Sequence, residues 1–154
     1  IIVNPLSNLY PEPNVNFGDT KSSIIAKLGT PDNETSTGIG YSGYSNSAPI
    51  LMFLFDDSNK MTSYSLMVKS SYSSILADFL SERYLVVSER DGLFMFINSL
   101  KPTTATKVIG LSLYNTSYWQ VMYIPNTTAK NTQIRSGKRL TDVDRFDELL
   151  KQLQ

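Results

Sequence analysis

The chain has 154 residues, 41% of them apolar, and its fourteen basic residues balance its fourteen acidic ones. This length and apolar content are enough to bury one core, and the balanced charge without a long basic stripe argues against a nucleic-acid partner. The absence of cysteine and histidine excludes disulfides, thiolate metal sites, cysteine nucleophiles and histidine bases. A hydrolase would need a serine with a lysine, or two carboxylates, and neither pattern stands out. We therefore expect no enzyme, no cofactor and no metal site.

The first residues of the chain predict an extended N-terminal arm. Residues 1–16 contain three prolines and show no sustained hydrophobic periodicity. The N-terminus lacks the order of charged, apolar and small residues that marks a signal peptide, and no apolar run is long enough to span a bilayer. Because the chain begins with Ile1 rather than Met, it is compatible with a targeting segment or lipid anchor that has been removed. We expect a periplasmic, cell-envelope or extracellular location.

A short helix is predicted within residues 17–32. Either Asp19 or Thr20 can cap its amide end. Gly29 can take the left-handed conformation that closes the last turn, and Pro31 prevents the helix from resuming. The apolar stripe of this helix consists of Ile24, Ile25 and Leu28. Since so short a helix is marginal in water, the stripe must pack on another element.

Two strands are predicted after this helix. The stretch from Asp32 to Ala48 is rich in Gly, Ser and Asn and predicts a short strand with a mobile loop. Residues 50–55 are apolar at every position, which is typical of a strand covered on both faces. A polar turn at 56–60 then leads to an antiparallel partner at 61–68. We interpret the acidic turn as an ordinary hairpin turn because it lacks the ligand spacing of a calcium loop.

A second helix and four strands are predicted next. Ser70 or Ser71 can cap a helix that runs to about Arg83. Its apolar residues recur at a spacing of three and four and are Tyr72, Ile75, Leu76, Phe79 and Leu80. The predicted strands of the following meander are 84–88, 93–99, 107–114 and 118–124. The Asp91-Gly92 pair between the first two is typical of a hairpin turn.

These elements predict an α+β fold made of two tandem units, 17–68 and 69–124, with the helices on one face of an antiparallel sheet. A connection and an amphipathic C-terminal helix follow within 125–154. We treat 17–154 as one domain, preceded by the arm. We expect the stripe of the C-terminal helix to pack on that domain.

The segment from Phe17 to Lys21, followed by the Leu28-Gly29-Thr30-Pro31 stop, resembles small outer-membrane lipoproteins of the BamE/SmpA/OmlA type and the related beta-lactamase-inhibitor-protein-like repeats. Tyr41 or Tyr44 would stand for the aromatic strand of those repeats, and Phe53-Leu54-Phe55-Asp56 for the last element. The match covers residues 17–68. The chain departs from the pattern in its second helix and longer meander, and in having no cysteine for a lipid anchor. The resemblance implies an envelope or secreted binding module and transfers no catalytic residue.

A protein partner is therefore expected to bind the sheet face that the helices leave open. Strand alternation places serines and aromatic residues there, although core packing is the alternative for the aromatic ones. The candidate partner-binding residues are Tyr41, Tyr44, Ser63, Ser65, Ser112, Tyr114 and Trp119.

An alternative is an inhibitor or immunity-like protein that uses the Tyr41–Ser47 loop as an inserted probe. A third possibility, a hydrolase without histidine or cysteine chemistry, would require a pocket with paired carboxylates, or a serine beside a desolvated lysine. The identity of the partner, the oligomeric state and the strand order do not follow from the sequence.

Overall fold

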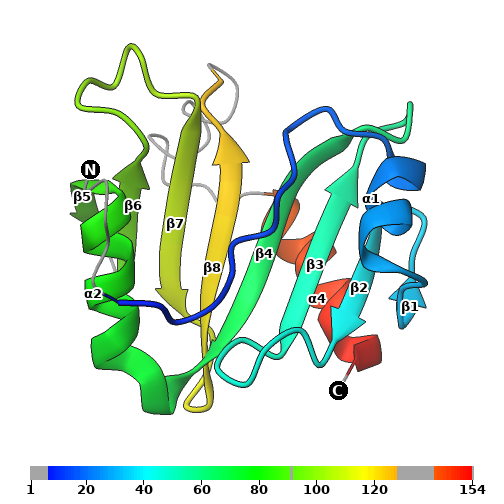
Figure 1. Cartoon of the computed structure of the whole chain (residues 1–154), viewed down its shortest axis with the longest axis horizontal. Helices are drawn as coiled ribbons and strands as arrows, with labels where there is room; N and C mark the ends of the chain where they lie inside the picture. The colour runs from blue at the N-terminus through cyan, green and yellow to red at the C-terminus, as the bar shows by residue number, and fades with distance from the viewer. Residues whose placement is uncertain (1–6, 91, 128–140, 154) are drawn as a thin grey trace.

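The computed structural model describes residues 7–90, 92–127 and 141–153. Within these residues, eight strands form one antiparallel sheet in the order β1-β2-β3-β4-β8-β7-β6-β5 (Figure 1). The elements in chain order are α1 (Lys21–Leu28), β1 (Asn33–Glu34), β2 (Gly38–Ser42), β3 (Ile50–Phe55), β4 (Met61–Lys69), η1 (Ser70–Tyr72), α2 (Ser73–Arg83), β5 (Leu85–Arg90), β6 (Leu93–Ile97), β7 (Lys107–Leu113), β8 (Tyr118–Pro125) and α4 (Thr141–Leu153). The α+β class is confirmed. The predicted connection between β8 and α4 lies mostly outside the described residues.

The short first helix begins and ends where its sequence predicts. The side chain of Thr20 accepts a hydrogen bond from the backbone N–H of Ser23, so Thr20 caps α1. Gly29 ends the helix at φ 90° and ψ −173°, a positive φ as expected, although ψ lies outside the left-handed helical region. Ile24 is fully buried and fixes α1 to the sheet.

The second helix begins later than the capping serines predict. Residues Ser70–Tyr72 form a 3₁₀ turn, and α2 starts at Ser73. The backbone N–H of Ser70 donates to the carbonyl of Ser117, and its hydroxyl donates to the carbonyl of Thr116, each at 2.8 Å. Because Ser70 is held by the β7–β8 turn, it does not cap α2.

The helices lie on both faces of the sheet. Helices α1 and α2 pack on the face that carries Phe53 and Tyr64, whereas α4 packs on the opposite face, against Met52 and Leu54 (Figure 1). The expectation that the helices leave one sheet face open is therefore wrong, because α4 covers part of that face. The reason lies in β3, whose six residues are all buried, so that both sides of the strand require cover.

The described part of the predicted arm, residues 7–16, crosses the face of α1 and α2 and belongs to the core (Figure 1). Tyr10 is only 2% exposed and its ring lies 4.5 Å from that of Phe79. Side chains also bind the arm's backbone, because Ser47 donates to the carbonyl of Leu9 at 2.7 Å and Arg83 donates to that of Ser7 at 2.8 Å. These residues act as a wall of the domain rather than as a linker.

Two strand glycines allow α4 to approach β2 closely. A Cβ atom on Gly38 would lie 2.8 Å from Cδ1 of Leu149 and 2.5 Å from the carbonyl oxygen of Phe53. A Cβ atom on Gly40 would lie 2.8 Å from Cδ1 of Leu153. None of the helices seen in the described ranges combines the length and apolar character that a membrane span requires.

We predict that Gly38→Ala lowers the free energy of unfolding by about 1–3 kcal/mol, because the strand backbone cannot move away from the added methyl group. Gly110→Ala is the matched control, since the nearest atom to its Cβ would be 3.6 Å away. We expect that control to be neutral or stabilising by up to about 1 kcal/mol. Urea denaturation of both variants measures the difference, and equal stabilities would contradict the close packing of α4.

Candidate functional site

Two of the predicted partner-binding residues, Ser63 and Ser65, are fully buried. The hydroxyl of Ser63 donates to Oδ2 of Asp142 in α4 at 2.7 Å, and Ser65 accepts from Nε2 of Gln120 at 3.3 Å. Their predicted exposure is wrong, because this sheet face forms a second core in which both hydroxyls are already hydrogen-bonded.

The two tyrosines of the predicted probe loop, Tyr41–Ser47, pack against other parts of the domain. Tyr41 lies in β2 rather than in a loop, is 7% exposed, and donates to the carbonyl of Gly29 at 2.8 Å. Tyr44 donates to the carbonyl of Pro11 in the arm. These side chains hold α1 and the arm in place, which is not the geometry of a projecting probe.

The remaining predicted residues do not form one surface. Trp119 pairs with Leu113 and lies on the face of α2, where its indole N–H donates to Oγ of Ser73 at 2.8 Å. Ser112 and Tyr114 flank Leu113 in the chain and point to the other face. The predicted set is thus divided between the two sides of the sheet.

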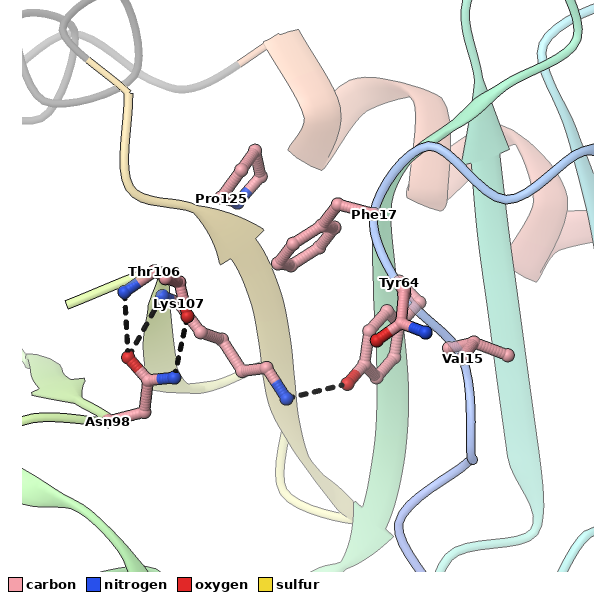
Figure 2. A pocket seen from close by; sticks show the side chains of 8 residues that line it. Val15, Phe17, Tyr64, Asn98, Thr106, Lys107 and Pro125 are labelled. Atoms are coloured by element: carbon pink, nitrogen blue, oxygen red, sulfur yellow. Dashed lines mark hydrogen bonds between the residues drawn. The ribbon is translucent and has the colours of Figure 1, made fainter.

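A pocket of about 490 Å³ lies away from these residues, between residues 15–17 and the strands β4, β7 and β8 (Figure 2). The arm, β4, the β6–β7 connection and the adjoining ends of β7 and β8 all contribute to it. Its lining residues are Val15, Asn16, Phe17, Tyr64, Asn98, Thr106, Lys107 and Pro125. This volume is in the range of small-ligand sites.

Among the described lining residues Lys107 is the charged one, and its backbone is held by Asn98. The Asn98 carbonyl oxygen accepts from the backbone N–H groups of Thr106 and Lys107, each at 3.0 Å, while its amide donates to Oγ1 of Thr106 at 2.9 Å. Figure 2 shows the Lys107 side chain running from β7 toward Tyr64. Its ammonium donates to the Tyr64 hydroxyl at 3.4 Å and lies 5.6 Å from the centroid of the Tyr123 ring.

The Lys107 side chain lies against two stacked aromatic rings. The rings of Tyr64 and Tyr123 are stacked with centroids 4.5 Å apart and planes 10° apart. Phe17 lies 6.0 Å from Tyr64 and forms part of the pocket wall. Lys107 is therefore placed against a rigid aromatic surface.

A hydrogen-bonded network of phenols continues into the core. The hydroxyls of Tyr84 and Tyr123 both donate to Oε2 of Glu12, at 2.6 Å and 2.8 Å. Tyr10 and Tyr123 also share a hydrogen bond of 2.8 Å. Glu12 from the arm is therefore tied both to β8 and to the residue that follows α2.

Burial raises the pKa of Tyr10, Tyr64, Tyr84 and Tyr123 well above the ordinary value of 10.0, and the negative charge of Glu12 adds to this effect in all four. These phenols stay neutral at physiological pH. They can donate and accept hydrogen bonds, but they do not supply a phenolate nucleophile or base.

The pocket has the composition of a binding site. Its described lining offers one ammonium, neutral hydroxyls and apolar walls, and contains neither a carboxylate nor a serine. Within residues 7–90, 92–127 and 141–153, no three acidic side chains come together in a way that could hold a metal ion.

Comparisons with known proteins add no relative. No family model, curated protein or solved structure matches this chain. The resemblance of residues 17–68 to envelope lipoproteins and inhibitor-like repeats therefore stays a prediction.

Sequence reasoning missed every residue of this pocket. Lys107 stands at the beginning of a predicted strand and belongs to no motif. Glu12 lies in a proline-rich segment. The alternation that places Val121 and Tyr123 on one face of β8 could have indicated a buried tyrosine. Nothing in the sequence indicates that the arm would meet it.

We predict that the free energy of unfolding falls as the pH rises above about 10. The unfolded chain then loses phenolic protons that the native state retains, because the four native pKa values lie higher. At lower pH this contribution is fully present. Tyr123→Phe should flatten the alkaline decline, and at neutral pH it should cost about 1–3 kcal/mol because Glu12 and Tyr10 lose a partner.

Urea denaturation across a pH series, followed by the fluorescence of Trp119, measures both effects. Tyr118→Phe is the control at neutral pH, since the Tyr118 hydroxyl bonds to no residue that the structure describes. We expect it to change stability by less than about 0.5 kcal/mol. A Tyr123→Phe variant with the same stability and pH profile as the native chain would contradict the network.

Proposed function

We propose that this protein is a noncatalytic binding module of the cell envelope or the exported fraction, and that it recognises a protein partner at the pocket beside the arm. A group projecting from the partner would enter the space between Phe17 and Lys107. The observation that carries this proposal is an accessible pocket with one cationic side chain held in place by neighbouring hydrogen bonds. Pockets with a few converging polar groups and apolar walls are common ligand sites.

The pocket is a better candidate for partner binding than the open sheet face expected from the sequence. Its walls come from segments far apart in the chain, and part-buried hydrogen bonds from Tyr84 and Tyr123 to Glu12 hold the arm against the sheet, so a ligand would meet a preformed surface. A preformed site loses less conformational entropy on binding.

The proposal includes a two-unit organisation. Helix α1 precedes the strands β1–β4, and α2 precedes β5–β8, so that each half is a helix followed by four strands. The halves meet where β4 pairs with β8. In this interpretation, the pocket lies at the junction of the units, where Tyr64 of one half and Lys107 of the other line it together.

The test is an NMR screen of the isotope-labelled chain against short peptides and small acids, amines and neutral compounds. We expect one chemical class to shift the backbone signals of Asn98, Thr106 and Lys107 saturably, with no chemical change in the compound. Asn16→Trp should abolish these shifts, because a large ring would occupy the pocket mouth. Asn16 is exposed and lines the pocket.

Asn14→Trp provides the control, since Asn14 is an exposed arm residue outside the pocket lining. It should leave the shifts intact. The proposal fails if the bound compounds shift residues elsewhere, if both tryptophan variants behave alike, or if mass spectrometry shows that a bound compound is converted.

A further inference from the structure

We propose that the pocket binds a carboxylate attached to an apolar group, with the Lys107 ammonium as its counter-ion. This inference rests on the proposed binding function and specifies the chemistry of the ligand. It is carried by the juxtaposition, in one pocket, of a cation without an ion pair among the described residues, a hydroxyl proton that no described residue accepts, and apolar walls (Figure 2).

Lys107 forms no ion pair with any residue in the described part of the chain. The three ion pairs found there join Lys21 to Glu34, Lys27 to Asp19, and Arg83 to Glu82. The ammonium of Lys107 contacts only the neutral hydroxyl of Tyr64 and the ring of Tyr123. An ammonium has three N–H donors, so at least two remain for a ligand.

A second donor lies beside the lysine in the chain. The Thr106 hydroxyl accepts from the amide of Asn98, which leaves its own proton available to a ligand. The amide of Asn98 is engaged with its neighbours on both its oxygen and its nitrogen. The pocket thus presents an ammonium and a hydroxyl donor, a set that matches the two oxygens of a carboxylate.

A single cation favours a monoanion. Among the residues that the structure describes, no other charged side chain lines the pocket, whereas dianionic phosphates are usually held by several cations or by a row of backbone N–H groups. Val15, Phe17 and Pro125 supply apolar walls that can cover an aromatic or aliphatic group. The combined features indicate an acid with an apolar body, either a free molecule or the end of a peptide.

The first experiment compares 3-phenylpropionate with its neutral amide by calorimetry on the full chain. We expect the acid to bind about tenfold or more tightly, because only the acid forms charge-assisted hydrogen bonds. Added salt should lower the affinity for the acid and leave the affinity for the amide unchanged. Equal binding of the two compounds would overturn the carboxylate proposal and leave the binding function standing. Failure of both to bind would overturn the carboxylate proposal, and the wider screen then decides the function separately.

The second experiment removes the cation. Lys107→Gln should abolish the preference for the acid over the amide, while Lys151→Gln, an equal charge change at an exposed residue of α4 on the far face, should retain it. A preference retained in Lys107→Gln would overturn the proposal. If that variant does not fold, the acid-to-amide comparison on the native chain still decides it.

The third experiment identifies the source of the carboxylate. One peptide ends in phenylalanine with a free carboxylate, a second has the same sequence with an amidated end, and a third carries glutamate beside phenylalanine inside an amidated sequence. Preference for the first supports recognition of a chain end, and preference for the third supports recognition of an acidic side chain. Binding of 3-phenylpropionate without either peptide supports a free acid. The proposal is overturned if the amidated first sequence binds, and binds as tightly as both its free acid and the third peptide.

Discussion

The antiparallel pairing of β4 with β8 is the constraint on which the rest of the structure depends. It joins the strands β1–β4 to the strands β5–β8, so that one sheet is formed from two segments far apart in the chain. The register places Tyr64 opposite Tyr123, and their rings stack at 4.5 Å. Both tyrosines are nearly inaccessible to water. If β8 shifted by one residue against β4, the Tyr123 ring would move to the other face and the stacked pair under Lys107 would be lost.

The arm covers the sheet face on which these two tyrosines lie. Glu12 accepts hydrogen bonds from Tyr84 and Tyr123, and Tyr10 fills the space against Phe79. Buried phenols are costly unless their hydroxyls are hydrogen-bonded, so the arm satisfies polar groups as well as covering apolar ones. The same segment then continues to Phe17 and forms one wall of the pocket. The arm therefore both covers the core and, where it continues to Phe17, forms a wall of the proposed ligand site.

The two faces of the sheet differ in how they are covered. The arm, α1 and α2 cover the face of Tyr64, and α4 covers the other face over β1, β2 and β3. The closeness of α4 depends on glycines in β2, because a side chain at Gly38 would meet Leu149. The buried pair of Ser63 and Asp142 lies on this second face. Polar residues on a strand thus do not identify its solvent side when a helix brings a matching polar group to them.

Local patterns were sufficient to predict most of the elements. The all-apolar run at 50–55, its turn and its partner match β3 and β4, and the four strands of the meander appear as β5 to β8. The cap at Thr20 and the stop at Gly29 were also predictable, because capping involves only residues within a turn or two. The start of α2 was not, because Ser70 binds the distant carbonyls of Thr116 and Ser117.

The chain by itself determined the α+β class, the strands and the lack of cysteine and histidine chemistry, since these depend on composition and on contacts between near neighbours. Only the tertiary structure decided the side of the sheet on which α4 lies, the burial of Ser63 and Ser65, and the meeting of the arm with Tyr123 and Lys107. Those features depend on strand order and on contacts between residues far apart in the chain, for which local periodicity carries no signal.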